Sequence, residues 1–201
     1  MTLLELLNSL PVAKSKTCHL CQEENNYPLL ADLLKILNPK SILEVGVWYG
    51  WSAVSFLYGA KEVQYYTGID CQCNIEFSGD LPDNNQNNKA KENIEYFRKQ
   101  TRKHFDFEVL NINTQNINNL DFLNCKHYDF IFIDADHHFI PCYKDLCNFW
   151  PVLNMNGNMM IDDSKDQEVR QAIDKFIFEI NEPNYNIESS RNGNWVISKT
   201  K

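Results

Sequence analysis

The stretch Ser41-Ile-Leu-Glu-Val-Gly-Val-Trp-Tyr-Gly-Trp-Ser-Ala53 decides the fold of this chain. Its short apolar run predicts a β-strand, its two glycines predict a tight turn, and the residues after Gly50 predict the start of a helix. Gly46 and Gly50 can adopt backbone angles that other residues avoid, so a ligand can lie directly against the main chain. The unpaired N–H groups of the first helical turn favour an anionic group of that ligand. Glu44 places a carboxylate beside the same turn.

The spacing of these residues separates two classes of nucleotide-type ligand. It reads Glu-x-Gly-x-x-x-Gly rather than the Gly-x-Gly-x-x-Gly of dinucleotide-dependent dehydrogenases, so the ligand need not carry a pyrophosphate. The pattern resembles the first motif of the class I S-adenosylmethionine-dependent methyltransferases. This resemblance implies that the turn from Gly46 to Gly50 packs against the methionine end of the cofactor, with Glu44 near its amino group. Ser52 is either only a helix cap or also a contact to the cofactor carboxylate.

Segments typical of strands and helices alternate along the rest of the chain. We expect strands at Ser41–Val45, Gln64–Ile69, Phe105–Asn111, Tyr128–Ile133, Asn158–Ile161, Tyr185–Ser189 and Trp195–Lys199. We expect helices at Thr2–Leu10, Pro28–Leu37, Trp51–Tyr58, Lys89–Lys103, Ile140–Trp150 and Lys165–Ile180. This order predicts an α/β fold with a Rossmann-like, seven-stranded, mostly parallel sheet, helices on both faces and a C-terminal antiparallel hairpin that turns at Arg191–Asn194. We expect one domain over residues 1–201, with N-terminal helices in residues 1–38 and the Rossmann-like core in residues 39–201.

Composition restricts the class of ligand. A length of 201 residues suits one complete core, and a net charge of −8 argues against broad electrostatic binding to nucleic acid or to an anionic membrane. We therefore expect a small-molecule substrate, and a homodimer is compatible with this sequence. The chain lacks an apolar run of about 20 residues and a basic leader, which favours a cytoplasmic location. Its cysteines, 7 in number, suit reduced thiols better than disulfides.

The resemblance, which covers about Pro28 to Asp163, also suggests residues for the adenosine end of the cofactor. Asp70 closes the second predicted strand about twenty residues after Gly50, where doubly wound folds place an acidic residue that faces a ribose. After the third strand, where the family has an acidic residue near adenine, we assign Asn113, with Thr114 as the alternative. Three aromatic residues could shield the cofactor sulfonium by cation–π contact: Trp48, Tyr49 and Trp51. Aromatic residues beside a strand are more often part of the core.

Carboxylates follow the fourth and fifth predicted strands. The fourth runs into Asp134-Ala-Asp-His-His-Phe139, and the fifth ends in Asp162-Asp163. Carboxyl ends of neighbouring parallel strands meet at one edge, so these groups can converge there and bind a hard cation such as Mg²⁺. The arrangement resembles the divalent-metal O-methyltransferases of the catechol, caffeoyl-coenzyme A, macrolide and aminocoumarin sugar types. It implies Asp134, Asp162 and Asp163 as metal ligands, with Asp134 also near the cofactor; the alternative is that Asp134 and Asp163 only cap helices.

These assignments predict a reaction. A metal would hold two adjacent acceptor oxygens, and Asp136 or His137, in preference to His138, would accept the hydroxyl proton. The sequence therefore predicts O-methylation of a catechol-, sugar- or polyol-like hydroxyl. The absence of an Asn/Asp-Pro-Pro-Tyr motif argues against methylation of DNA bases or glutamine. Two alternatives stay open: a catalytically inactive binding protein of the same fold, and a nicotinamide-dependent oxidoreductase.

Overall fold

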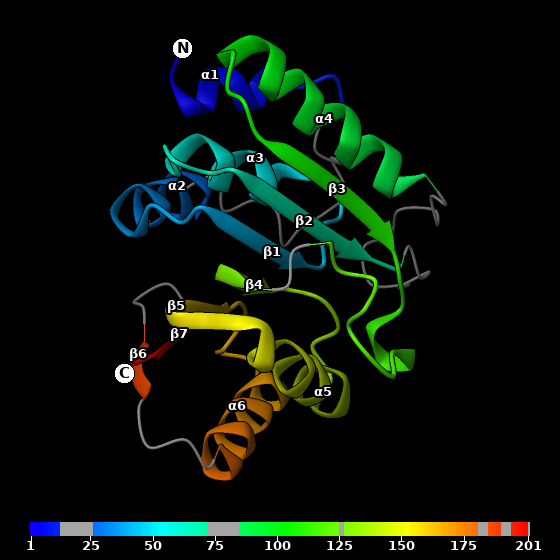
Figure 1. The fold of residues 1–201 in the computed structure, drawn as a ribbon, viewed down its shortest axis with the longest axis vertical. Helices are drawn as coiled ribbons and strands as arrows, with labels where there is room; N and C mark the ends of the chain where they lie inside the picture. Colours follow the sequence, from blue (N-terminus) through cyan, green and yellow to red (C-terminus); the bar gives the residue numbers. More distant parts are fainter. Residues whose placement is uncertain (13–25, 72–84, 125–126, 181–184, 190–193, 201) are drawn as a thin grey trace.

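The computed structural model describes residues 1–12, 26–71, 85–124, 127–180, 185–189 and 194–200 (Figure 1). Its strands are β1 (Ser41–Val45), β2 (Tyr65–Asp70), β3 (Asp106–Asn111), β4 (Tyr128–Ile133), β5 (Leu153–Ile161), β6 (Tyr185–Ser189) and β7 (Trp195–Lys199). Its α-helices are α1 (Leu3–Asn8), α2 (Asn26–Leu37), α3 (Trp51–Gly59), α4 (Gln86–Thr101), α5 (Phe139–Phe149) and α6 (Gln167–Glu179). Short 3₁₀ turns lie at η3 (Thr114–Asn116) and η4 (Trp150–Val152).

The strands form one mixed sheet in the order β3-β2-β1-β4-β5-β7-β6. Neighbours from β3 to β5 run parallel, whereas β7 is antiparallel to both β5 and β6. The predicted α/β class, the mostly parallel sheet and the C-terminal antiparallel pair are therefore confirmed. The hairpin turn expected at Arg191–Asn194 lies outside the described residues except for Asn194.

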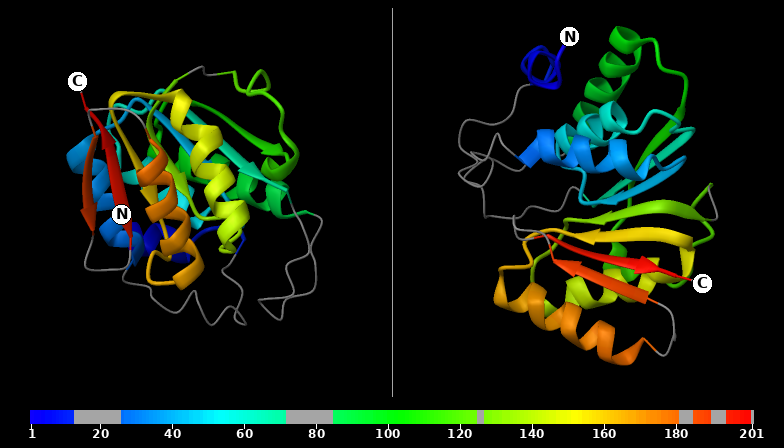
Figure 2. Two further views of the ribbon diagram at one scale, coloured as in Figure 1. Left: turned by 90° about the horizontal axis from the view of Figure 1, so that it is seen from below. Right: turned by 90° about the vertical axis from the view of Figure 1, so that its left-hand side faces the viewer.

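Helices cover both faces of the sheet (Figures 1 and 2). Helices α1 to α4 lie on one face and α5 and α6 on the other, and each set encloses its own hydrophobic cluster. The central strand β4 supplies residues to both clusters, because its side chains alternate between the two faces. No helix in the described ranges is both long enough and apolar enough to cross a membrane.

Some predicted boundaries were wrong for local reasons. Helix α4 stops at Thr101 because Arg102 adopts a left-handed conformation with φ 55°, two residues before the predicted end. Helix α6 begins after Asp166, whose carboxylate accepts hydrogen bonds from the N–H groups of Glu168 and Val169. Strand β5 begins earlier than expected, since Leu153 already pairs with β4 before a register shift.

The turn after β1 places Gly46 against the backbone that follows β4. Gly46 has φ +92°, and a Cβ atom built there would lie 1.8 Å from the carbonyl oxygen of Asp134. Gly50 has φ +76°, but its nearest atom would be the Cα of Ala90 at 3.2 Å. The first glycine is therefore required by close contact as well as by its backbone angle, and the second mainly by its angle.

We expect Gly46→Ala to destabilise the protein by about 2–5 kcal/mol, because left-handed strain adds to overpacking against main-chain atoms. Gly50→Ala is the matched control, with an expected cost of about 1–2 kcal/mol from strain alone. Urea unfolding of both variants measures these costs. Equal costs for the two variants would contradict the assigned contact.

Candidate active site

The glycine turn is organised by Asp70 at the end of β2. One oxygen of the Asp70 carboxylate, Oδ2, accepts hydrogen bonds from the backbone N–H groups of Val47 at 3.0 Å and Trp48 at 2.9 Å. Trp48 needs such support because its φ is 50°. Asp70 therefore lies beside the turn and holds it in shape, while its predicted contact with a ribose stays a prediction.

Glu44 lies in β1, two residues before Gly46, and is fully buried. Its carboxyl oxygens accept hydrogen bonds from the hydroxyl groups of Ser52 and of Tyr66, the latter at 2.5 Å. Burial raises the pKa of Glu44 to about 8, although both hydroxyl groups oppose the shift. The hydrogen bond between Glu44 in β1 and Ser52 in α3 thus links the two elements that flank the turn.

Three carboxyl groups follow the same face of adjacent strands. In β1, Ile42 packs among α1 to α4, so Glu44, two positions later, lies on that face. The same alternation places Asp134 two positions after Phe132 and Asp162 two positions after Met160. Because β1, β4 and β5 are neighbours, these groups line one edge of the sheet on the side of α2 and α3.

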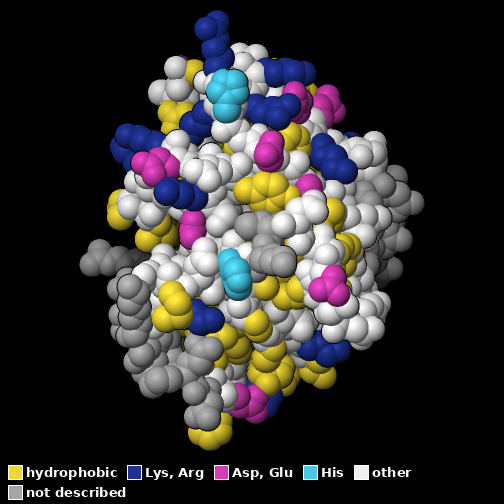
Figure 3. All heavy atoms as spheres, viewed as in Figure 1, with side chains coloured by type: hydrophobic (Ala, Val, Ile, Leu, Met, Phe, Trp, Pro, Cys, Tyr) yellow, Lys and Arg dark blue, Asp and Glu magenta, His cyan; other side chains and the backbone are white. Residues whose placement is uncertain are grey.

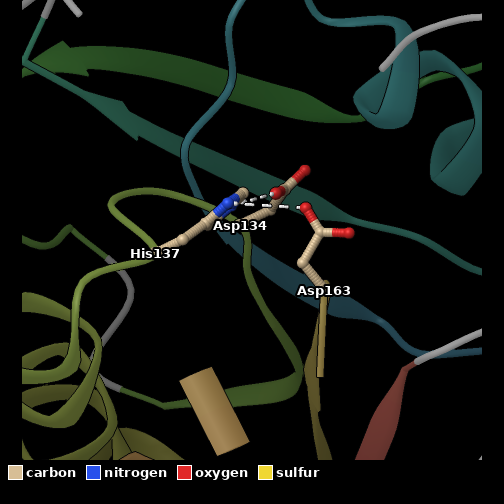
Figure 4. A group of neighbouring side chains, drawn as sticks. All are labelled: Asp134, His137 and Asp163. Carbon is tan, nitrogen blue, oxygen red and sulfur yellow. Dashed lines mark hydrogen bonds and ion pairs between the residues drawn. The ribbon is translucent and has the colours of Figure 1, made fainter. Parts of the chain in front are cut away.

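Asp134, His137 and Asp163 form the cluster shown in Figure 4. The imidazole of His137 faces both carboxylates, with Nε2 3.4 Å from Asp134 Oδ1 and Nδ1 3.5 Å from Asp163 Oδ2. The hydrogen bond with Asp134 is the main cause that raises the pKa of His137 to about 9. Partial burial raises the pKa of Asp134, whereas the same hydrogen bond opposes that shift. An imidazolium between two carboxylates offsets their repulsion.

Asp162, the remaining predicted metal ligand, lies outside this cluster. Asp162 is outside the set whose ligand atoms come within 4.8 Å of one another, and its Oδ1 accepts the N–H of Asp163 at 2.9 Å. Burial raises the pKa of Asp162 to about 7. Asp163 reaches His137 from a left-handed backbone with φ 49°. The structure thus brings together two of the predicted metal ligands and a predicted catalytic residue.

Neither aspartate of the cluster caps a helix, so this alternative was wrong. Helix α5 is preceded by His138 and helix α6 by Asp166. Two carboxylates and an imidazole within 4.8 Å are a donor set that fits a divalent cation of the Mn²⁺, Fe²⁺ or Zn²⁺ kind as well as Mg²⁺. The side-chain types of the cluster are therefore compatible with a divalent cation.

The other predicted residues lie nearby in separate interactions. Asp136 pairs with His138 rather than with His137, since its Oδ1 lies 2.6 Å from His138 Nδ1 and accepts the His138 N–H at 2.9 Å. Asn113 is exposed and caps η3, because its side chain accepts the N–H of Gln115 at 2.9 Å. Asp136 is thus at the rim of the cluster, and Asn113 is beyond the end of β3.

Two buried or half-buried groups gave no clear signal in the sequence. Tyr27 lies in the first turn of α2, one residue before the predicted start of that helix. Asp145 is 1% exposed on α5, where Cys142, Leu146 and Phe149 are its buried neighbours. Its position on the apolar stripe, three residues after Cys142, was the available signal for Asp145.

Asp145 links helix α5 to the segment after β3 through a hydrogen bond with Gln115. Its Oδ1 accepts a hydrogen bond from Gln115 Nε2 at 3.2 Å, and Gln115 also donates to the carbonyl of Pro141 at 3.3 Å. Oδ2 is buried and has no hydrogen-bond partner among the described residues. Burial raises the pKa of Asp145 to about 7. The carboxyl group is therefore costly when ionised.

Comparison with known proteins places the chain in a family. A sequence profile of the family described as "Methyltransferase domain" matches residues 43–164, which is more than half of the chain. The chain belongs to this family, and the predicted class, an S-adenosylmethionine-dependent methyltransferase of class I fold, is confirmed. Comparison with curated protein sequences gives no match.

Solved structures agree on the fold. The O-methyltransferase from Bacillus cereus in complex with S-adenosylhomocysteine is similar with a TM-score of 0.63 and 17% identity, over 99% of this chain and 90% of that chain. The S-adenosylhomocysteine-bound methyltransferase PaMTH1 from Podospora anserina gives 0.68 and 16%, over 99% and 88%. The O-methyltransferase TomG from Streptomyces achromogenes, in complex with S-adenosylmethionine, gives 0.66 and 14%, over 96% and 94%.

We expect Asp145→Asn to remove one component of the pH dependence of stability. Because the folded pKa is raised, the unfolded chain ionises first, so this group lowers wild-type stability as pH rises from about 4 to about 7, by up to about 4 kcal/mol. The variant should therefore gain stability relative to wild type at pH 8 but not at pH 4. Urea unfolding at both pH values measures the difference, with the exposed Asp174→Asn as control. A difference that is the same at both pH values would contradict this prediction.

Proposed function

We propose that this protein transfers a methyl group from S-adenosylmethionine to a hydroxyl of a small molecule of catechol, sugar or polyol type, assisted by a divalent cation. One observation carries the proposal. The glycine turn after β1 and the cluster of Asp134, His137 and Asp163 lie at the same edge of adjacent strands, with Gly46 directly against the backbone of Asp134. A donor at the turn and an acceptor at the cluster would then be neighbours.

On the donor side, the turn from Gly46 to Gly50 would receive the methionine end of the cofactor, supported by Glu44 and Ser52. Asp70 would accept hydrogen bonds from the ribose through its carboxylate. Asn113, beyond β3, is the proposed neighbour of adenine. The structures of other methyltransferases that hold this cofactor or its product on the same fold support the assignment.

On the acceptor side, Asp134, His137 and Asp163 would hold the cation, and Asp162 would add negative charge from beside them. A divalent cation supplies Lewis acidity that lowers the pKa of an acceptor hydroxyl. Asp136 would take the hydroxyl proton, or His137 would take it if Asp134 and Asp163 alone hold the cation. The oxygen would bond to the methyl carbon, and the electrons of the broken bond between sulfur and that carbon would stay on sulfur. The cluster would thus align the acceptor oxygen with the donor.

The surface supports a small-molecule substrate. On the face in Figure 3, Lys and Arg side chains are interspersed with Asp and Glu rather than joined into one basic surface. With a net charge of −8, such a surface gives little attraction for a polyanion. The acceptor is therefore proposed to be a small molecule rather than a polyanion.

We expect methyl transfer to a dihydroxybenzoate or a sugar of a test panel to fall at least 100-fold in Asp134→Asn and in Asp163→Asn, because each loses a charged ligand. Excess chelator should abolish the transfer and Mg²⁺ or Mn²⁺ should restore it. Radiolabelled methyl transfer measures turnover, and Asp174→Asn on α6 is the matched control. Full turnover in both site variants would refute the role of the cluster.

The inactive alternative has its own signature. A protein that binds S-adenosylmethionine in isothermal titration but transfers no methyl group to any acceptor of the panel, with or without a divalent cation, would be a binding protein of this fold. A protein that binds neither S-adenosylmethionine nor S-adenosylhomocysteine at millimolar concentration would refute the proposed function.

A further inference from the structure

Tyr27 lies at the edge of the sheet where β1 ends and the glycine turn begins, because of the direction of α2. This helix ends at Leu37, and β1 begins at Ser41, at the opposite edge of the sheet. The helix therefore runs antiparallel to β1, and its first turn, which contains Tyr27, lies at the edge where β1 ends. Figures 1 and 2 show α2 beside α3 on one face of the sheet, and Ile42, Phe132 and Met160 lie in the hydrophobic cluster of that face.

The rings of Tyr27 and Trp51 pack against each other at this edge, and we call this pair of rings the aromatic corner. Their ring centroids are 5.8 Å apart and their planes meet at 50°. Trp51 is the first residue of α3, directly after the glycine turn, and its indole N–H donates to the carbonyl of Val12 at 3.4 Å. Both rings are only partly buried, although they pack against the core. The corner is therefore held in place while part of each ring stays accessible.

The surroundings of the corner are negatively charged. Burial, and then the charges of Asp134, Glu44 and Asp162, raise the pKa of Tyr27 well above its usual range. The phenol stays neutral, and its ring lies near the carboxyl groups of Asp134 and Asp162, whereas Glu44, with a pKa of about 8, is largely protonated at neutral pH. An aromatic face near such groups favours a cation over a neutral ligand group.

The other aromatic residues of the turn are placed differently. Tyr49 is buried, and the ammonium group of Lys89 lies 5.2 Å from its ring centroid. Trp48 packs edge-on against Tyr49, with centroids 5.4 Å apart. Tyr49 is thus packed against Lys89 and Trp48, and the ring of Trp51 packs against Tyr27 from α2.

We propose that Tyr27, with Trp51, is a specificity-determining residue that receives the positively charged methyl sulfonium and makes the site prefer S-adenosylmethionine to S-adenosylhomocysteine. This inference rests on the proposed function, since it requires the cofactor at the glycine turn. Methyl transfer breaks the bond between sulfur and the methyl carbon and leaves the electron pair on sulfur, so the product is a neutral sulfide. The attraction to the corner is lost with the charge, and this weakens product binding.

Isothermal titration of the full chain with S-adenosylmethionine and with S-adenosylhomocysteine tests the proposal. We expect Tyr27→Leu to lower the ratio of the two affinities about fivefold to thirtyfold, by weakening the charged donor more than the neutral product. Tyr27→Phe keeps the aromatic face and should keep the ratio within about twofold. Tyr58→Leu, at the far end of α3, is the control for loss of a tyrosine elsewhere, and thermal melts verify that each variant is folded.

The outcomes separate this inference from the proposed function. If wild-type protein binds both ligands and Tyr27→Leu weakens both equally or neither, the inference is overturned and the proposed function stands. If Tyr27→Phe lowers the ratio as much as Tyr27→Leu, the hydroxyl rather than the ring acts, which also overturns it. If wild-type protein binds neither ligand, the proposed function fails and the inference with it.

Discussion

The contact between Gly46 and the backbone of Asp134 is the constraint on which the site depends. The hydrogen-bond pattern of the sheet continues past the strand ends, because Gly46 donates to Ile69 and Asp134 donates to Val45, each at 2.8 Å. Asp162 extends it further by donating to Ile133 at 3.0 Å. The turn and the acidic segments are thus parts of one rigid edge, so a shift of the turn would move the carboxylates with it.

A second constraint is the accumulation of carboxyl groups at this edge. Each carboxyl group is stabilised differently: Glu44 by buried hydroxyl groups, Asp70 by backbone N–H groups of the turn, and Asp134 by the imidazole of His137. The raised pKa values of Glu44 and Asp162 show that these interactions only partly offset burial. An edge of this kind gains stability from any cation that enters it, whether proton, metal ion or positively charged ligand.

The sequence predicted the elements that depend on local pattern. The turn at Gly46 followed from glycine spacing, and the convergence of Asp134 with Asp163 followed from the rule that parallel strands end at one edge. It did not predict that Asp163 would turn toward His137 and leave Asp162 behind, because that depends on a left-handed backbone at Asp163. Tyr27 was missed for another reason: the strand pattern says nothing about which residue of a preceding helix reaches the edge, and this depends on the packing of α2 on α3.

The position of α2 has a consequence for how ligand preference and chemistry are divided over the fold. The segment that matches the family begins at residue 43, whereas α2 ends at Leu37. The edge that carries the candidate site therefore combines the matched segment with a helix before it, and the solved methyltransferases, which align over up to 99% of this chain, extend over that helix as well. Substitutions in α2 would change ligand preference while the sheet, the turn and the acidic strand ends remain unchanged, so selectivity and chemistry are separable traits on one scaffold.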